Sequence, residues 1–395
     1  MPDSIIDTTR AEAAQLSNEE LGRYVRQLIV PDVSLIGQRR LKASRVLCIG
    51  VGGLGSPAAL YLAAAGVGTI GLVDFDRVER SNLHRQILHG TDDVGRRKLE
   101  SASETLRQTN PNVELVLHES RFSAENATRI VAEYDVVVDG SDNFATRYLS
   151  NDVCVWARKP NIYGSVFRFD GQVSVFAPHL SGPCYRCMFP EPPPLGAAPS
   201  CEEAGVLGVL PGVIGTLQAT EAMKLILGAG ETLIGRLLHF EALKMKFREF
   251  NLRRDPDCPV CGDRPTIFEP IDYDDFCSQS AAGVGPDTEA IPVLSVQELK
   301  QKLDAHEPVT LLDVREPFEY DIARIAGAKL IPLGELEERL AEIDRGADIV
   351  IHCHSGVRSA HAVELLRQAG LTDVYNLAGG IDAWSREVDE SVPRY

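Results

Sequence analysis

The sequence has no apolar run long enough to span a bilayer and no excess of basic residues. Its most apolar segment, residues 60–73, is interrupted by glycines and is shorter than the roughly 20 residues that a membrane helix needs. The chain has 40 lysines and arginines against 57 aspartates and glutamates, so its formal net charge is −17. Residues 1–16 lack the apolar core of a signal peptide. We therefore expect a cytoplasmic protein, with neither nucleic acid nor a membrane as its partner.

Two α/β patterns follow each other along the 395 residues, a length sufficient for two or three domains. A segment without apolar periodicity separates them, because residues 269–291 are acidic and then rich in small residues. We predict a first domain over residues 1–268, a linker over 269–291 and a smaller domain over 292–395.

The order of apolar segments predicts the fold class. In the first domain strands alternate with helices, with strands expected over 45–49, 69–73, 113–117 and 135–138 and helices over 56–65, 98–108 and 124–133. This alternation predicts an α/β, Rossmann-like fold, and further strands over 161–167 and 172–176 before an apolar helix over 212–227 predict a mixed sheet. The second domain has a shorter α/β pattern, with strands over 310–314, 349–352 and 374–376 and helices over 334–342 and 359–368.

A glycine-rich turn between the first strand and its helix predicts a nucleotide site. Its glycines are Gly50, Gly52, Gly53 and Gly55, and such a turn lets phosphates approach backbone N–H groups. Asp74 ends the next strand, 24 residues past Gly50, where a carboxylate can bind ribose hydroxyls. Alone, this pattern also fits a dinucleotide dehydrogenase.

Polar residues that follow the turn favour a different chemistry. They are Asp76, Asn82, Arg85 and Lys98, together with Asp142 at the end of a later strand. Hydride transfer has no need for such a group, whereas cleavage of the α–β bond of ATP does, because charge builds on the leaving pyrophosphate. A carboxylate near those phosphates is a candidate Mg²⁺ ligand.

Two C-x-x-C pairs predict a metal site. Cys184 and Cys187 form one pair, and Cys258 and Cys261 form the other. Four thiolates suit a tetrahedral Zn²⁺ with no open position, which is a structural site; two disulfides or redox pairs are the alternative. Cys201 lies outside both pairs, in a loop of small residues.

Cys353 lies on a turn between an apolar strand and a helix. Helix N-termini offer free N–H groups, and with Arg358 nearby the thiol should be acidified toward thiolate. A buried core cysteine is the alternative, but it would need neither Gly356 nor Arg358. Four residues separate Cys353 from Arg358, one fewer than in the tyrosine-phosphatase signature. The smaller cradle favours a persulfide sulfur over a phosphate.

This loop resembles the active loop of single-domain rhodaneses, which are sulfurtransferases. Residues 311–316, 327–328 and 378–384 resemble further rhodanese motifs, and we expect Asp313 and Arg315 to form an ion pair at a strand end. The first domain resembles the MoeB/ThiF-type E1 adenylyltransferases at residues 23–27, 50–55, 74–76, 81–86, 98 and 139–143. The whole chain therefore resembles the MoeZ-type adenylyltransferase/sulfurtransferases.

The resemblance assigns roles to the polar residues. It implies ATP as substrate, with Asp74 on the ribose, Arg85 and Lys98 on the phosphates, Asn82 assisting them and Asp142 on Mg²⁺. It also implies a homodimer, because the family residue equivalent to Arg26 enters the ATP site of the neighbouring subunit. The split four-cysteine zinc site occurs in the same family.

The resemblance further implies a two-step reaction on a ubiquitin-like (β-grasp) sulfur carrier that ends in Gly-Gly. ATP adenylates the terminal glycine, and a Cys353 persulfide then converts it to a thiocarboxylate, with Cys201 resolving the intermediate. The sulfur donor is thiosulfate or a persulfidated cysteine desulfurase, and His354 and Ser355, in place of a basic residue, disfavour thiosulfate. The alternative is an E1 that passes its carrier on as a thioester, with the rhodanese domain as a docking module. The sequence leaves open whether the pathway is molybdopterin, thiamin, cysteine or tRNA thiolation.

Overall fold

The chain forms two compact units. The computed structural model describes residues 4–193, 205–273, 276–277 and 291–395. Those up to residue 277 form the N-terminal unit, and residues 291–395 form the C-terminal unit. Among these residues no helix combines the length and the apolar character that crossing a membrane requires.

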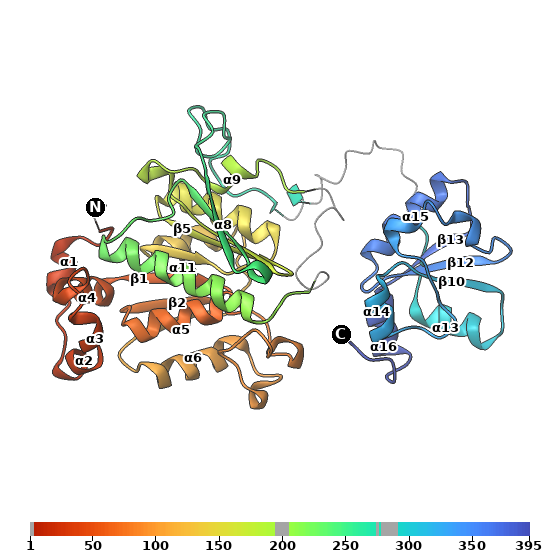
Figure 1. The fold of residues 1–395 in the computed structure, drawn as a ribbon, viewed down its shortest axis with the longest axis horizontal. Coiled ribbons are helices and arrows are strands. Elements are labelled where there is room, and N and C mark those ends of the chain that lie inside the picture. The colour runs from red at the N-terminus through yellow and green to blue at the C-terminus, as the bar shows by residue number, and fades with distance from the viewer. Residues whose placement is uncertain (1–3, 194–204, 274–275, 278–290) are drawn as a thin grey trace. The chain divides into compact units, whose positions relative to one another are not determined.

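An eight-stranded mixed sheet forms the centre of the N-terminal unit, with the strand order β3-β2-β1-β4-β5-β6-β7-β8 (Figure 1). The first five strands of this order pair in parallel, and the remaining pairs are antiparallel. The strands are β1 (Arg45–Ile49), β2 (Thr69–Val73), β3 (Glu114–His118), β4 (Val136–Asp139), β5 (Asn161–Phe167), β6 (Asp170–Phe176), β7 (Arg236–Glu241) and β8 (Lys246–Asn251). The predicted α/β fold with a mixed sheet is confirmed.

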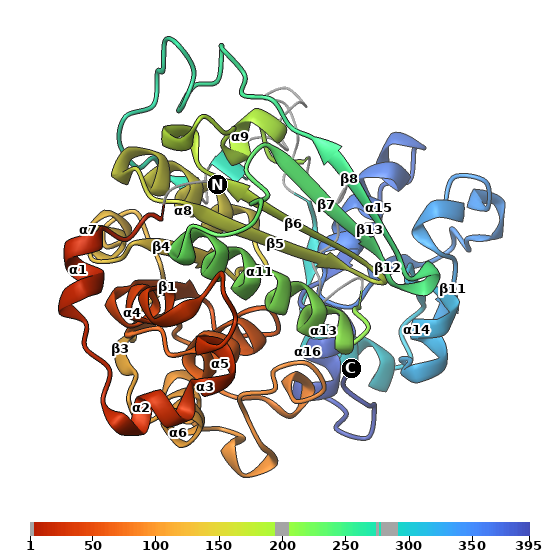
Figure 2. The same cartoon turned by 60° about the vertical axis from the view of Figure 1, so that its left-hand side comes forward.

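Helices cover both faces of this sheet. On one face α5, α6 and α11 share a buried core, and α11 lies across β5 and β6 (Figure 2). On the other face α7 and α8 share a second core. The helices of the unit are α1 (Thr8–Ala13), α2 (Asn18–Arg23), α3 (Val25–Leu28), α4 (Ser34–Ala43), α5 (Gly55–Ala65), α6 (Lys98–Thr109), α7 (Ala127–Ala132), α8 (Phe144–Ala157), α9 (Tyr185–Met188) and α11 (Val209–Leu227).

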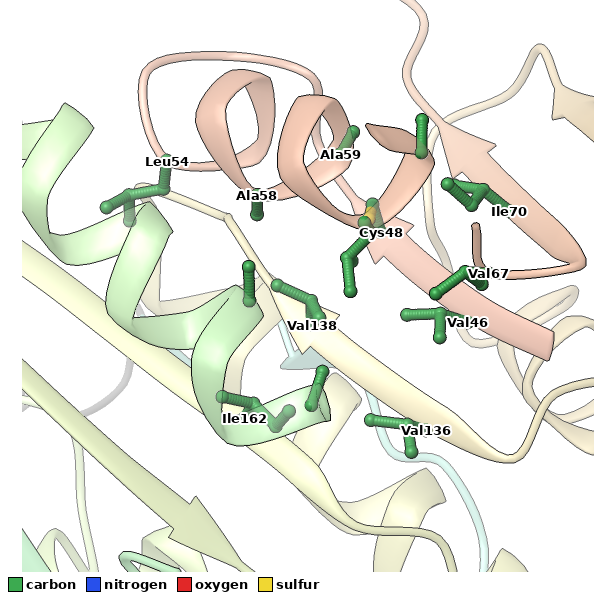
Figure 3. Close-up of a cluster of buried hydrophobic side chains, with 14 of the residues drawn as sticks. Val46, Cys48, Leu54, Ala58, Ala59, Val67, Ile70, Val136, Val138 and Ile162 are labelled. Atoms are coloured by element: carbon green, nitrogen blue, oxygen red, sulfur yellow. The ribbon is translucent and has the colours of Figure 1, made fainter. Parts of the chain in front are cut away.

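The first core shows why these residues form a two-sided sheet. Successive strand side chains point to opposite faces, so Val46 and Cys48 of β1 pack toward α5 while Leu47 packs in the second core. Ala58 and Ala59 lie against them on the small apolar face of α5 (Figure 3). Because Cys48 is fully buried there, its pKa rises to about 12, which fits an inert core thiol.

The strand order fixes where a ligand can bind. β2 and β3 lie on one side of β1, and β4 and β5 lie on the other. In sheets of this kind ligands bind beyond the carboxyl ends of the strands where the order reverses. The glycine-rich turn follows β1, Asp74 follows β2, and residues 140–143 follow β4, so all three reach this crevice.

The C-terminal unit is a smaller α/β domain, as predicted. Its sheet has the order β11-β10-β12-β13-β9, with every pair parallel and a buried core on each face. Its elements are β9 (Val293–Leu294), α13 (Val296–Asp304), β10 (Val309–Asp313), α14 (Pro317–Ile322), β11 (Lys329–Leu330), β12 (Asp348–His352), α15 (Val357–Gln368), β13 (Val374–Leu377) and α16 (Gly380–Glu387). Cys353 follows β12, the central strand.

One expected helix of this unit is wrong. Residues 334–342 contain two 3₁₀ turns, Leu333–Glu335 and Leu340–Glu342, in place of an α-helix. Leu336 is fully buried between the two turns, whereas Glu337 and Glu338 are exposed. A single buried anchor with polar neighbours does not supply the continuous apolar face that stabilises a helix.

Candidate active site

A cavity of about 250 Å³ lies at the carboxyl ends of β1, β2 and β4. Most residues predicted to bind nucleotide or Mg²⁺ line it, namely Gly50, Gly52, Gly53, Asp74, Asp76, Arg85, Lys98 and Asp142. The fold thus brings together, from five separate segments, the groups that the sequence pattern singled out. Gly55, Asn82 and Arg26 are not among the lining residues.

Two glycines shape the turn after β1. Gly50 has φ +84°, a left-handed conformation that favours glycine. A Cβ on Gly55 would lie 1.9 Å from the carbonyl oxygen of Gly50, so no other residue fits there. Gly55 therefore closes the turn, and Gly52 and Gly53 present backbone to the cavity.

The carboxylate of Asp74 is tied to this turn. One oxygen accepts a hydrogen bond from the N–H of Val51 at 3.0 Å, and the other accepts from the N–H of Asp76 at 2.9 Å. Asp74 is buried and lines the cavity, so its remaining acceptor sites point to where ribose hydroxyls can donate.

Basic side chains line the cavity, although the chain as a whole is acidic. Lys98, at the start of α6, is buried and pairs with Asp76 at 2.9 Å. Arg85 donates to the carbonyl of Ser81 at 3.1 Å and contacts His84. Asn82 is buried beside them, and its side chain accepts from the N–H of Glu79 at 3.2 Å, so it shapes the turn that carries Arg85.

The start of α8 forms the opposite wall. Asn143 caps the helix by accepting from the N–H of Thr146 at 2.9 Å, and exposed Asp142 directly precedes this cap. Arg147, one turn later, is buried, lines the cavity and donates to the carbonyl of Ser141 at 3.1 Å. Arg147 was not among the residues predicted from the sequence, although its position five residues after Asp142 places it on the same end of the helix.

Arg26 lies away from this cavity. It lines a second groove, with Arg23, Tyr61, Thr216 and Met223, on the surface formed by α3, α5 and α11. Within one chain Arg26 is therefore not part of the nucleotide pocket, and its predicted role in a neighbouring subunit stays a prediction.

The four predicted metal-ligand cysteines meet in space. Their sulfurs all lie within 4.8 Å of one another, with Cys184 at 3.5 Å from Cys258 and Cys187 at 3.3 Å from Cys261. Tetrahedral zinc with Zn–S bonds of about 2.3 Å requires sulfurs about 3.8 Å apart, so the set can hold such an ion with small adjustments. A hydrogen bond with Cys184 lowers the pKa of Cys187, which favours the thiolate that a metal needs.

A buried ion pair joins this cluster to α8. Arg186, between Cys184 and Cys187, donates from Nε to Asp152 at 2.9 Å and from Nη2 to the same carboxylate at 2.8 Å. The two side chains are 1% and 0% exposed, and the Tyr273 hydroxyl also donates to Asp152 at 2.8 Å. The cysteine cluster and the helix that begins at the nucleotide pocket are thus one packed structure.

In the C-terminal unit the Cys353 loop holds its sulfur by hydrogen bonds. The sulfur accepts from the N–H of Gly356 at 3.1 Å and from the hydroxyl of Ser359 at 3.4 Å, and Cys353 is 1% exposed. Gly356 has φ +102° and caps α15, which explains the glycine. This arrangement supplies dipoles for a thiolate or persulfide anion.

The basic residue of the loop has a carboxylate partner. Arg358 donates with both terminal nitrogens to Glu319 of α14, each at 2.7 Å. Burial raises the pKa of Glu319, but hydrogen bonds from Arg358, the N–H of Glu316 and Tyr395 together outweigh it, so the pKa is lowered. Asp313 and Arg315 form the expected ion pair, fully buried at the end of β10. Cys201 lies outside the described residues.

Comparisons with known proteins agree with two functional domains in one chain. Residues 24–260 match the ThiF family, and residues 295–387 match the Rhodanese-like domain. Over 388 residues the chain is 47% identical to the probable adenylyltransferase/sulfurtransferase MoeZ of Mycobacterium tuberculosis, with 97% of each chain covered. This chain belongs to the adenylyltransferase/sulfurtransferases that join a ThiF domain to a rhodanese domain.

Further relatives of this family and its fold support the assignment. The chain is 42% identical over 401 residues to adenylyltransferase and sulfurtransferase MOCS3-1 of Zea mays, covering 98% of this chain and 86% of that one. Among solved structures, E. coli MccB aligns with TM-score 0.56 and 25% identity, over 65% of this chain and 76% of MccB. The prediction of an enzyme with nucleotidyltransferase and sulfurtransferase domains is confirmed by this membership.

Proposed function

We propose that this enzyme adenylates the C-terminal glycine of a ubiquitin-like sulfur carrier and then converts it to a thiocarboxylate with sulfur carried on Cys353. One observation carries this proposal: a single chain contains both sites. The first is the pocket at the glycine-rich turn, lined by Lys98 and Arg85, and the second is the Cys353 loop, in which the Gly356 N–H holds the sulfur. The full-length relatives are named for both activities.

In the first step the carrier carboxylate attacks the α-phosphorus of ATP. A P–O bond forms to the carboxylate, the α–β bond breaks, and pyrophosphate leaves with the electron pair. Lys98 and Arg85 neutralise the charge that develops, and Asp74 orients the ribose. Mg²⁺ held by Asp142 would supply further positive charge on the phosphates.

In the second step the Cys353 persulfide attacks the acyl adenylate. An acyl–sulfur bond forms, AMP leaves, and carrier and enzyme are joined as an acyl disulfide. A thiolate, for which Cys201 is our candidate, then attacks the Cys353 sulfur and releases the thiocarboxylate. The new disulfide is reset by a cellular dithiol reductant.

The Cys353 persulfide itself forms by sulfane transfer. The thiolate attacks the outer sulfur of thiosulfate, or of a persulfidated cysteine desulfurase, and sulfite or the desulfurase thiolate leaves.

The four-cysteine cluster fits one structural Zn²⁺, because its four thiolates leave no position for a substrate. A thiol-based enzyme of this kind fits the reducing cytoplasm.

We also propose that the enzyme works as a homodimer. Apolar side chains are exposed around Arg26, with Val25 47%, Ile29 65% and Tyr61 54% exposed. A second copy would cover them and bring its Arg26 to the neighbouring pocket. The Arg26→Ala and Asp142→Ala variants should each lack ATP–pyrophosphate exchange, and mixing them should restore part of it, because a mixed dimer contains one intact site. Two inactive proteins that stay inactive when mixed would refute the arrangement.

Pyrophosphate exchange into ATP tests the proposed function. The wild type should catalyse it only with a carrier that ends in Gly-Gly, Asp142→Ala should abolish it, and Cys353→Ala should retain it while losing thiocarboxylate formation. Loss of both activities in folded Cys353→Ala would refute the two-site scheme. A stable carrier thioester with no thiocarboxylate would instead favour the conjugating E1.

A further inference from the structure

Tyr395 contacts one end of the sulfur-transfer loop directly, at His354, and is linked to the other end, at Arg358, through Glu319 of α14. At the first end its ring packs edge-on against His354, with ring centroids 4.8 Å apart, and its main-chain oxygen lies 2.9 Å from His354 Nε2. Its hydroxyl donates to Glu319 of α14 at 3.2 Å, and Glu319 is the carboxylate that holds Arg358 at the other end of the loop. His354 directly follows the nucleophile, and Arg358 ends the loop.

The hydroxyl of Tyr395 also accepts from the guanidinium of Arg315. Arg315 is fully buried and held by Asp313 at the end of β10. The Tyr395 hydroxyl therefore bridges the Arg315 guanidinium and the Glu319 carboxylate. This bridge helps to hold Glu319 where it binds Arg358.

The backbone next to Tyr395 is anchored beside the loop as well. Arg394 pairs with Asp382 of α16 at 2.9 Å. The N–H groups of Ile381 and Asp382 donate to the carbonyls of Cys353 and His354 at 3.0 and 3.1 Å. The first turn of α16 thus holds the backbone of the loop, and Tyr395 holds the side chain of His354.

We propose that Tyr395 is a positioning residue for sulfur transfer, which holds His354 at one end of the Cys353 loop and, through Glu319, Arg358 at the other. This inference rests on the proposed function and adds a residue to its sulfur-transfer part. Tyr395 touches no reacting atom, since its contacts are with His354, Arg315 and Glu319. It acts by fixing the loop in which the Cys353 sulfur receives its hydrogen bonds.

Single-turnover formation of the Cys353 persulfide from thiosulfate, followed by intact-protein mass spectrometry of the full chain, tests this role. Thiosulfate gives its outer sulfur to the Cys353 thiolate and leaves as sulfite. At saturating thiosulfate, Tyr395→Ala should slow the step at least about tenfold, because it removes both the ring contact and the hydroxyl bridge. Tyr395→Phe keeps the ring and the main-chain oxygen and should slow it only about threefold, the effect of one lost hydrogen bond.

Coupling between His354 and Tyr395 separates positioning from general support of the fold. If the two residues act through one contact, the His354→Ala/Tyr395→Ala double variant should be no slower than the slower single variant. Independent effects that multiply in the double variant would refute a shared role. Should Tyr395→Ala fail to fold, Tyr395→Phe and Glu319→Gln carry the test through the hydroxyl contact instead, and their combination should be no slower than the slower single variant.

Tyr320 offers a matched control in the same unit. Its hydroxyl donates to the carbonyl of Ala328 at 3.0 Å, so Tyr320→Phe removes a hydrogen bond elsewhere and should leave the persulfide rate unchanged. Carrier-dependent pyrophosphate exchange should be unchanged in all variants. A folded Tyr395→Ala protein that forms the persulfide at the wild-type rate overturns this inference alone. A wild type that forms no persulfide from any sulfane donor overturns the proposed function with it.

Discussion

Lys98 and Asp76 form an ion pair at the nucleotide pocket, with Nζ and Oδ2 2.9 Å apart. The lysine side chain is 8% exposed and the aspartate side chain 49% exposed, so the cation faces the cavity while its partner remains partly in solvent. A triphosphate that enters the cavity therefore meets an ammonium already held in place.

We expect Lys98→Met to lower carrier-dependent pyrophosphate exchange by about 10²- to 10³-fold, the range found when one preorganised donor to a developing charge is removed. Lys98→Arg keeps the charge and should retain part of the activity. Exchange kinetics of the three proteins with equal melting temperatures make the comparison. Wild-type exchange in Lys98→Met would remove Lys98 from the phosphate site.

The four-cysteine cluster should contain about one zinc per chain by elemental analysis. Cys258→Ser removes a ligand whose sulfur lies 3.5 Å from that of Cys184, and it should release the metal and lower the stability of the N-terminal unit. Cys277→Ser, outside the cluster, is the control and should keep the metal. A folded wild type that contains no metal would contradict the site.

The buried pair of Arg186 and Asp152 makes a prediction about stability. Asp152→Asn leaves a buried guanidinium without its counter-charge and should lower the free energy of unfolding by about 3–5 kcal/mol. Replacing both partners, as Asp152→Leu with Arg186→Met, should cost less than the single change. Urea unfolding followed by Trp156 fluorescence in a Trp384→Phe background measures both. A double variant less stable than the single one would show that the charges contribute a net gain.

His352 makes the stability of the C-terminal unit depend on pH. It is fully buried, with Nε2 3.7 Å from Asp313, and burial lowers its pKa below the usual 6.5. Because the unfolded chain binds a proton below that pH and the folded unit does not, the free energy of unfolding should fall as the pH drops below 6.5.

His352→Gln should remove this part of the pH dependence. Urea unfolding between pH 5 and 8, followed by Trp384 fluorescence in a Trp156→Phe background, compares the two proteins. Parallel pH profiles for wild type and variant would show that His352 does not titrate on unfolding.

Much of the fold followed from local patterns in the sequence. The bounds of β1 and β5 agree with the prediction, because their apolar residues are bordered by Gly50 and Pro160. β8 was missed because all six of its residues are exposed, and it is held by pairing with β7. α8 was missed because Arg147, Asn151 and Asp152 are buried on its inner side and interrupt the apolar period.

The site was predictable where its chemistry lies in short motifs. The glycine turn, the C-x-x-C pairs and the Cys353 loop each have a spacing that indicates a function. The partners of these motifs come from distant segments, as Glu319 does for Arg358 and Tyr395 for His354, so only the folded chain reveals them.

The most direct measurement of the central claim is the mass of a Gly-Gly carrier after incubation with this enzyme, ATP, Mg²⁺ and a sulfane donor. We predict that one terminal oxygen is exchanged for sulfur, that the exchange requires ATP, and that Cys353→Ala prevents it while pyrophosphate exchange continues. A carrier that gains sulfur equally well with Cys353→Ala, or that never gains it although the wild type consumes ATP, would contradict the account.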